Sequence, residues 1–231
     1  MKRILLKLSG EAIKAQSATN YDPDFMDMLA QKIIGLTQQG LQVGIVVGGG
    51  NLYRGVQGTN IGITRATGDS MGMVGTIMNG LAIADFINQR GGRTRVLSAI
   101  EIPRVCDFFS RSAALHHFRE GRVVICVAGT GNPYFSTDSG AVQRALEMEC
   151  DMVIKATKVN GIYDSDPATN PGAKKYPHIS HQKVIEDNLR IMDLTAVAMA
   201  KDNNMPMFVC KMEDIDRLAD EDLSFGTVVK S

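Results

Sequence analysis

The chain has 231 residues, with 25 Lys plus Arg and 25 Asp plus Glu, so its formal net charge is zero. This balance argues against a general nucleic-acid binder, because such proteins normally carry a basic excess. Apolar residues make up 44% of the chain, an ordinary share for a globular protein. No apolar run approaches the ~20 residues of a membrane span, so no membrane partner is predicted.

Six nearly continuous apolar runs predict β-strands. This composition is typical of strands that are buried on both faces of a mostly parallel sheet. Helical segments lie between the runs, so the predicted fold class is α/β, a three-layer α/β/α sandwich formed by a single domain of residues 1–231. The predicted strands are residues 3–8, 42–47, 94–98, 122–127, 151–156 and 207–210.

Two of the predicted helices have clear start signals. The first has Asp22 as its expected N-cap and Pro23 in its first turn, and it ends at Gly40. The other begins at Thr137 or Asp138, within the segment TDSGAVQRALEMEC. Polar residues with short side chains are common at such positions because they satisfy free backbone amides.

The stretch 65–91 predicts a long helix that is Met-rich and apolar on more than one side. We expect Met71, Met73 and Met78 to pack in the core, since methionine fills irregular spaces there. The loop 163–177 is interrupted by Pro and Gly, and loops of about 15 residues are usually functional or mobile.

The cysteines and histidines predict no metal site. The four cysteines form no CxxC pair, which indicates reduced, buried thiols in a cytoplasmic protein. His178 and His181 are three residues apart but lack a third ligand nearby, so a zinc site is not expected. His116 and His117 are expected at the surface.

Residues 43–55, VGIVVGGGNLYRG, join a strand-like run to three glycines and an arginine. A purely structural turn is one interpretation, because glycine adopts positive φ without strain. The other is a phosphate loop, in which bare amides backed by a helix N-terminus surround an anion. The run matches neither a Walker A loop nor G-x-G-x-x-G, so it would be a phosphate loop of another kind.

Polar groups follow several predicted strands. In open α/β sheets, ligands bind beyond the carboxyl ends of the strands. Lys7 and Ser9 follow the first strand, and the glycines and Arg54 follow the second. Asp138 comes after the fourth strand, and Asp166 comes after the fifth. Lysines, an arginine, bare amides and carboxylates at one edge would suit a polyphosphate ligand.

Six segments together resemble the bacterial uridylate kinase family of the amino acid kinase superfamily, over residues 2–229. The resemblance implies an amino acid kinase-like fold and the reaction ATP + UMP → ADP + UDP in pyrimidine biosynthesis, with Mg²⁺ bound to ATP. It also implies a cytoplasmic homohexamer built as a trimer of dimers, with GTP and UTP as effectors. The segments are KLSGEA, VVGGGNLYRG, GDSMGMVGTIMNGLA, AGTGNPYFSTDS, KATKVNGIYDSDP and MDLTAVAMAKDNNMP.

The resemblance implies roles for residues that match the family pattern. The residues implied in ATP binding are Lys7, Leu8, Ser9, Gly10, Gly50, Arg54, Thr157, Tyr163 and Asp166. The residues implied in UMP binding are Gly49, Asp69, Thr130, Gly131, Asn132, Pro133, Tyr134, Phe135, Ser136 and Thr137. Residues 13–23, IKAQSATNYDP, lack the glycine-rich turn of the family near its allosteric site, so the response to GTP and UTP is left open.

The chemistry itself requires mainly positioning and charge neutralisation, because the acceptor phosphate is already an anion. Lys7 would neutralise charge on the transferred phosphoryl group. Lys155 or Lys158 would add a second ammonium group, and Lys155 is nearer the polar end of its strand. Asp138 would orient these lysines or accompany Mg²⁺. Its alternative is a purely structural helix cap.

Two other functions fit many of the same residues. One is a kinase of the same superfamily whose acceptor is a carboxylate or a carbamate. The other is a nucleotide-binding regulator without catalytic activity. Asp69 and the segment TGNPYFST favour a ribose and a pyrimidine as the acceptor, and the joint presence of Lys7 and Asp138 favours catalysis.

Overall fold

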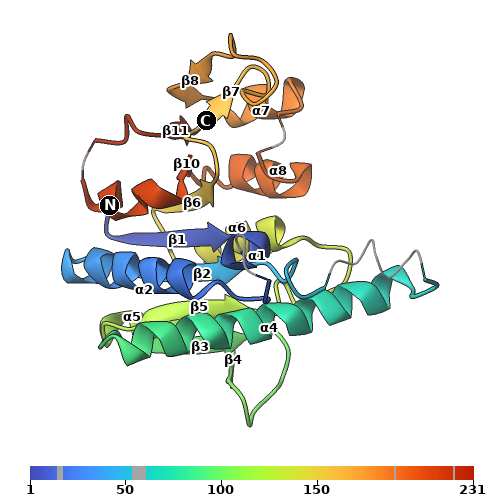
Figure 1. Ribbon diagram of the computed structural model, residues 1–231, viewed down its shortest axis with the longest axis vertical. Helices are drawn as coiled ribbons and strands as arrows, with labels where there is room; N and C mark the ends of the chain where they lie inside the picture. The colour runs from blue at the N-terminus through green and yellow to red at the C-terminus, as the bar shows by residue number, and fades with distance from the viewer. Residues whose placement is uncertain (15–17, 54–60, 190, 221) are drawn as a thin grey trace.

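A mostly parallel sheet forms the centre of the molecule in this computed structural model, which describes residues 1–14, 18–53, 61–189, 191–220 and 222–231 (Figure 1). Its nine described strands run in the order β4-β3-β5-β2-β1-β6-β10-β11-β9. All pairings are parallel except that of β10 with β11. The strands are β1 Arg3–Leu8, β2 Gln42–Val47, β3 Thr94–Ser98, β4 Asp107–Phe108, β5 Val123–Val127, β6 Met152–Thr157, β9 His178–Ile179, β10 Met207–Lys211 and β11 Thr227–Val229.

Helices cover both faces of this sheet, as the predicted three-layer fold requires. The bounds are α1 Gly10–Lys14, α2 Pro23–Gln38, α4 Arg65–Gln89, α5 Arg111–Arg119, α6 Thr137–Glu147, α7 His181–Glu186, α8 Leu194–Asp202 and the 3₁₀ helix η1 Met212–Ala219. One apolar cluster joins the sheet to α2, α4 and η1, and the other joins it to α5, α6, α7 and α8. The prediction of an α/β/α sandwich is therefore confirmed.

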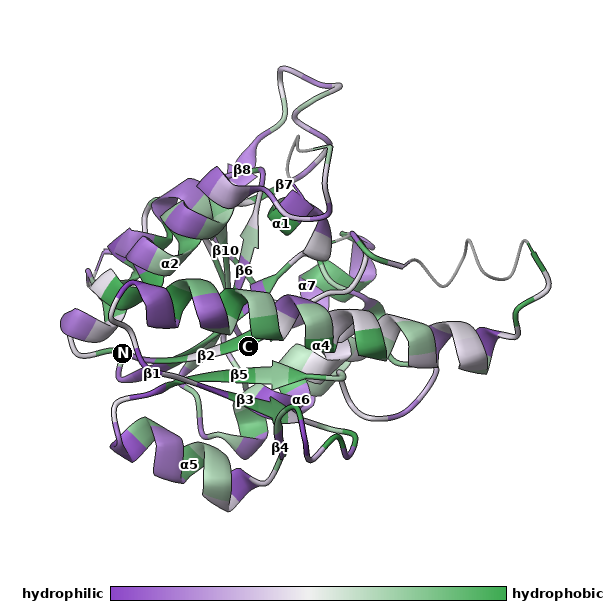
Figure 2. Ribbon diagram, turned by 60° about the horizontal axis from the view of Figure 1, so that its bottom comes forward, coloured by the Kyte–Doolittle hydropathy of each residue, from purple (hydrophilic) through white to green (hydrophobic). Residues whose placement is uncertain are grey.

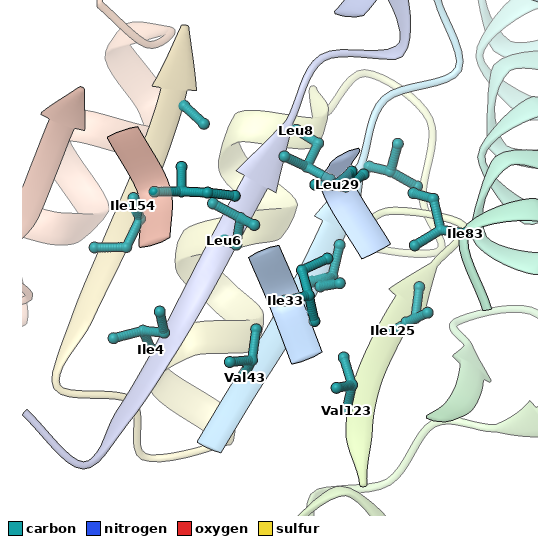
Figure 3. Close-up of a cluster of buried hydrophobic side chains, with 14 of the residues drawn as sticks. Ile4, Leu6, Leu8, Leu29, Ile33, Val43, Ile83, Val123, Ile125 and Ile154 are labelled. Atoms are coloured by element: carbon teal, nitrogen blue, oxygen red, sulfur yellow. The ribbon is translucent and has the colours of Figure 1, made fainter. Parts of the chain in front are cut away.

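Alternation along the strands divides the side chains between these clusters. Ile4, Leu6 and Leu8 of β1 belong to the cluster under α2, whereas Leu5 belongs to the opposite cluster. Successive side chains of a strand point to opposite faces, so one apolar strand serves both layers. Figure 3 shows side chains of β1, β2 and β5 on the face of the sheet that α2 and α4 cover. Lys7 must therefore lie on the same face as Leu5, which is the face covered by α6.

The predicted strands were close to those found. The bounds of β1, β2 and β3 match the prediction. β5 and β10 each differ by one residue at one end, and β6 is shifted by one residue at both ends. Asp151, predicted as the first residue of its strand, lies before β6. Its carboxylate accepts hydrogen bonds from the backbone N–H groups of Lys2, at 2.6 Å, and Arg3, at 2.9 Å. The first helix was also predicted well, since the Asp22 side chain caps α2.

The long helix α4 runs across the sheet, and its N-terminal half projects past the strand ends (Figures 1 and 2). It is long and apolar enough to cross a membrane, a test that the core helices of soluble proteins also pass. The prediction that its methionines pack in the core was wrong for two of them. Met71 is 39% exposed and Met78 is 50% exposed, whereas Met73 packs against the core.

Other local predictions were corrected or refined. His117 is buried rather than at the surface, because α5 packs this side of the helix onto the sheet, while His116 is exposed. The four cysteines are buried and free, as expected. The loop 163–177 is closed at its base by an antiparallel pair of short strands, β7 Ile162–Tyr163 and β8 Lys175–Tyr176.

Candidate active site

Two lysines, Lys7 buried and Lys155 partly buried, share one carboxylate at the carboxyl ends of adjacent strands. Lys7 of β1 and Lys155 of β6 are direct partners in the parallel register. Nζ of Lys7 lies 2.7 Å from Oδ1 of Asp138, and Nζ of Lys155 lies 3.1 and 3.0 Å from its two carboxylate oxygens. Asp138 comes from the first turn of α6 on the same face of the sheet. The three residues predicted as catalytic are therefore in contact.

Charge and burial act against each other in this cluster. Burial alone would raise the pKa of Asp138, but the positive charges of Lys7 and Lys155 outweigh it and hold this pKa below its usual range. Burial, followed by the charge of Lys7, lowers the pKa of Lys155, and Asp138 opposes the shift only in part. Lys158 is exposed, and the ion pairs of Asp138 within the described residues are with Lys7 and Lys155. Two ammonium groups held this close favour an anionic ligand.

The helix that carries Asp138 is capped by another residue. The Ser136 hydroxyl accepts hydrogen bonds from the backbone N–H groups of Asp138, at 2.9 Å, and Ser139, at 3.2 Å. The interpretation of Asp138 as the helix cap is therefore wrong, because its carboxylate faces the lysines. Asp193, the N-cap of α8, accepts hydrogen bonds from the hydroxyls of Ser136 and Ser139. It ties the start of α6 to the start of α8.

A cavity of about 380 Å³ opens beside the two lysines. Its lining is Lys7, Ser9, Glu11, Ala12, Phe25, Lys155, Ala156, Thr157, Lys158, Met212 and Glu213. Of the residues predicted to bind ATP, Lys7, Ser9 and Thr157 are in this lining. The Leu8 side chain is in the core, so only its backbone faces the strand end. Tyr163 and Asp166 lie in the β7–β8 hairpin, outside the described lining.

The glycine run after β2 packs closely on two other elements. A Cβ added to Gly49 would lie 2.7 Å from the backbone oxygen of Gly72 in α4. A Cβ added to Gly10 would lie 2.6 Å from the oxygen of Gly48. By contrast, a Cβ on Gly50 would meet only the Glu11 side chain, at 3.9 Å. Close packing therefore explains Gly49 and Gly10, whereas Gly50 has open space beside it. Arg54, predicted to contact ATP, lies outside the described residues.

Two buried side chains of α4 hold the loops that follow β2 and β5. Asn79 is fully buried, and its amide donates hydrogen bonds of 2.7 Å both to the backbone oxygen of Gly48 and to the side-chain oxygen of Asn51. The Thr76 hydroxyl accepts a 2.7 Å hydrogen bond from the backbone N–H of Ala128. Ala128 has a φ of 61°, a conformation that is unusual for a residue other than glycine. Both loops are thus fixed to one helix.

A second cavity, of about 130 Å³, lies between these two loops and α4. It is lined by Gly49, Gly50, Tyr53, Gly68, Asp69, Gly72, Met73, Thr76, Gly129, Thr130, Asn132, Phe135, Ser136 and Thr137. Most residues predicted to bind UMP are in this set, and Gly50, predicted for ATP, is there too. Of the others, Gly131, Pro133 and Tyr134 lie on the same loop but outside the described lining. A separate cavity, of about 530 Å³ between α4 and residues 103–107, contains none of the predicted site residues in its described lining.

Asp69 connects α4 to the loop after β5. Its carboxylate accepts a 2.8 Å hydrogen bond from the backbone N–H of Tyr134 and hydrogen bonds of 2.9 Å from Nε of Arg65. The Arg65 guanidinium also lies 5.8 Å from the centre of the Tyr134 ring. Tyr134 has a φ of 71°, so this loop is held in a strained turn beside the cavity.

Comparison with known proteins agrees with this geometry. A sequence profile of the amino acid kinase family matches residues 2–211. A uridylate kinase from Erythrobacter litoralis is 48% identical over 219 residues, which is 95% of this chain and 92% of the relative. The chain belongs to the amino acid kinase family.

Solved structures of the same family have the same arrangement. The UMP kinase of Bacillus anthracis matches with a TM-score of 0.95 and 33% identity, covering 99% of this chain and 96% of its own. The UMP kinase of Ureaplasma parvum matches with a TM-score of 0.93 and 35% identity, covering 100% of this chain and 99% of its own. The amino acid kinase-like fold predicted from the sequence is confirmed.

Several residues of this amino acid kinase site were missed by the sequence analysis. Arg65 could have been found, because it lies four residues before Asp69 and the two face each other on a helix. Thr76 and Asn79 gave no signal of their own beyond their place in a recognised segment. Arg144 is buried, stacks 4.1 Å above the Phe109 ring and donates a 3.3 Å hydrogen bond to the Gly129 oxygen. A lone arginine in a helix does not predict such a contact.

Proposed function

We propose that this chain transfers the γ-phosphoryl group of ATP to UMP, giving ADP and UDP. The observation that carries the proposal is the cluster of Lys7, Asp138 and Lys155 between the two cavities. The lysines line the larger cavity, while Thr137, the neighbour of Asp138, lines the smaller one. The uridylate kinase relatives and the UMP kinase structures support the choice of UMP as acceptor.

In this proposal the lysines act by neutralising charge. The phosphate of UMP is already anionic, so its attacking oxygen needs no base to remove a proton. Two polyanions must instead approach each other, and two ammonium groups in a partly buried site offset their repulsion. Asp138 keeps Lys7 and Lys155 side by side, which their own repulsion would oppose. It is a positioning group and accepts no proton during transfer.

We propose that Mg²⁺ enters with ATP as part of the substrate. Magnesium retains several waters and usually combines one or two carboxylates with substrate phosphates. Both oxygens of Asp138 already face ammonium groups, which favours binding of the ion through the phosphates. Magnesium then supplies further charge neutralisation on the transferred group.

The acceptor half is proposed to hold UMP between α4 and the loop after β5. Asp69 is proposed to accept hydrogen bonds from the ribose, and the turn at residues 130–137 is proposed to surround the base and the phosphate. The Ser136 hydroxyl is engaged in capping α6, so its contact with UMP would come from the backbone. A carboxylate or carbamate acceptor would make no use of Asp69.

Assembly and regulation are proposed from the resemblance and from one surface. Met71, Val74 and Met78 expose a line of apolar side chains on α4, with exposures of 39%, 49% and 50%. Such a patch supports a homo-oligomer, for which we propose a cytoplasmic trimer of dimers. GTP and UTP are proposed as effectors. The segment 13–23, whose sequence left the response to these effectors open, is described only in part, because positions 15–17 lie outside the described residues.

A coupled ADP-release assay with a panel of acceptors tests the proposed function. We expect turnover with UMP, weak turnover with dUMP, and none with amino acids or carbamate. Asp69→Asn keeps an oxygen for the Tyr134 N–H but loses the charge, so it should raise the KM for UMP more than that for ATP. Tight binding of UMP without turnover would show a regulator instead. Turnover with a carboxylate substrate would favour the other kinase class.

A further inference from the structure

Asp193 joins the starts of two helices on one face of the sheet. It is the N-cap of α8, where its Oδ1 accepts a 2.8 Å hydrogen bond from the backbone N–H of Ala196. The same carboxylate accepts hydrogen bonds from the hydroxyls of Ser136 and Ser139 at the start of α6. It belongs to the segment MDLTAVAMAKDNNMP, which holds none of the residues proposed to bind ATP or UMP or to act in catalysis.

This carboxylate fixes the direction of the Ser136 hydroxyl. A serine hydroxyl carries a single proton, so once it donates to Asp193 its oxygen can only accept from other groups. It accepts from the backbone N–H groups of Asp138, at 2.9 Å, and Ser139, at 3.2 Å. Hydrogen bonds to an ionised acceptor are roughly twice as strong as neutral ones. The charge of Asp193 therefore holds Ser136 in the orientation that caps α6.

A second contact ties the carboxylate to the same turn. Ser139 is 1% exposed, and its hydroxyl lies 3.2 and 3.3 Å from the two carboxylate oxygens of Asp193. Beyond this point α6 and α8 are in contact and contribute apolar side chains to one cluster, namely Ala141, Ala145, Ala196, Val197 and Ala200. Asp193 is the polar end of this helix contact.

The turn that Asp193 holds carries the carboxylate shared by the two lysines. Asp138 follows Ser136 by two residues, and its oxygens lie 2.7 Å from Nζ of Lys7 and 3.0 Å from Nζ of Lys155. A misplacement of about 1 Å in such a cluster can cost about 10²-fold in rate. A shift at the start of α6 would therefore disturb both ammonium groups.

We propose that Asp193 is a positioning residue for phosphoryl transfer. It acts through Ser136 and Ser139, which fix the first turn of α6, and so keeps Asp138 between the two lysines. This role rests on the proposed function. Asp193 is absent from the described lining of both cavities, so it acts through these residues and is not itself catalytic.

The substitution Asp193→Asn separates the two contacts of this carboxylate. Asn caps helices as well as Asp does, so its amide oxygen keeps the Ala196 hydrogen bond. Its NH₂ group then faces Ser136 and cannot accept the hydroxyl proton. We expect kcat to fall by about tenfold, the effect of one lost hydrogen bond. The KM for ATP should stay the same, because the described lining of the larger cavity contains no residue of α6.

A double-mutant cycle with Asp138→Asn shows whether the effect passes through Asp138. Asp193→Asn should lower kcat much less in the Asp138→Asn protein than in the wild type, because the lysines have already lost their shared partner. Ser180→Ala is the matched control, since it removes the N-cap of α7 in the same apolar layer. It should lower the melting temperature by a similar amount and leave kcat unchanged.

Amide hydrogen exchange of the unliganded protein tests the structural step without turnover. Asp193→Asn should speed exchange at the N–H groups of Asp138 and Ser139 and leave that of Ala196 as in the wild type. Unchanged exchange at α6 would overturn the role, as would equal kcat losses with and without the Asp138 carboxylate, or an equal kcat loss in Ser180→Ala. Failure of the wild type to phosphorylate UMP would contradict the proposed function instead. The exchange result, and the same cycle with the acceptor that does turn over, would then decide the role of Asp193.

Discussion

Lys7 and Asp138 are 131 positions apart in the chain, yet Nζ of Lys7 lies 2.7 Å from Oδ1 of Asp138. Only 7% of Lys7 is exposed, so the pair is largely shielded from water. A buried lysine beside a buried carboxylate is costly to maintain unless each has its counter-charge. Here one carboxylate serves two lysines, which leaves positive charge for an anionic substrate.

The first prediction concerns catalysis by this pair. Lys7→Met should lower kcat by ~10²–10³, because charge neutralisation by Lys7 is needed most in the transition state. Asp138→Asn should also lower kcat, since it releases both lysines from their shared partner. The double variant should lose much less than the product of the two single losses, because the residues act as one unit. Single-turnover transfer at saturating ATP, Mg²⁺ and UMP measures these rates.

The capping geometry provides the control for this prediction. Ser136 caps α6 and Asp138 does not, so Asp138→Asn should leave the helix start intact. Thermal melts recorded beside the rates separate the two effects. A variant with the wild-type rate and a lower melting temperature would mean that Asp138 has a structural role only.

The second prediction is a loss of activity on the alkaline side. Burial and the charge of Lys7 lower the pKa of Lys155 from its ordinary 10.5. As pH rises through the lowered value, Lys155 becomes neutral and no longer offsets phosphate charge, so kcat/KM should fall at a pH below 10.5. Lys155→Arg keeps the charge at all these pH values and should move the fall to higher pH. A pH profile that the substitution leaves in place would assign the fall to another group.

The third prediction separates the roles of Gly49 and Gly50 in the glycine run after β2. Gly50 has open space beside it, so Gly50→Ala should melt like the wild type and raise the KM for ATP if the phosphates approach this amide closely. A Cβ at Gly49 would press on the backbone of α4, so Gly49→Ala should lower the melting temperature as well as weaken UMP binding. Kinetics and melts of both variants give the comparison. If the Gly50→Ala variant is folded and binds ATP normally, the glycine run is a structural turn and not a phosphate loop.

Much of this fold follows from local pattern. The strands β1 and β2 are continuous apolar runs, and burial on both faces gives them bounds that can be predicted to the residue. The pairing of Lys7 with Lys155 could not be predicted in this way, because residues from distant parts of the chain become neighbours only when the strand order is known. Sequence alone therefore left Lys155 and Lys158 as alternatives.

Predictions failed where the outcome depends on what covers a surface. Met71 and Met78 belong to a helix that is apolar on several sides, and its pattern does not say which side meets the sheet. His117 was assigned to the surface, but α5 turns it inward beside Phe118 and places its Nδ1 2.9 Å from the Arg122 guanidinium. Both errors reflect helix packing, which overrides residue type.

The last prediction concerns Thr76 and Asn79, which connect α4 to the two loops of the site. Thr76→Val keeps the shape but leaves the buried Ala128 N–H unpaired, and Ala128 begins the loop that lines the smaller cavity. The KM for UMP should rise by about tenfold, the effect of one lost hydrogen bond to a buried group, while the KM for ATP changes little. Thr76→Ser keeps the hydroxyl and should therefore bind UMP like the wild type, unlike Thr76→Val.

Asn79 should behave differently because its amide holds the glycine run, which carries both Gly49 and Gly50. Asn79→Leu removes its hydrogen bonds to Gly48 and Asn51, so the KM values for UMP and ATP should rise together. Ile83→Val, one turn further along the same helix, controls for lost stability because Ile83 is buried in the apolar core. If Ile83→Val lowers the melting temperature as much as Asn79→Leu does and also raises both KM values by the same factor, Asn79 acts through stability alone. A selective effect of Thr76 on UMP, joined to a shared effect of Asn79, would make α4 the element that sets the two nucleotides at the distance required for transfer.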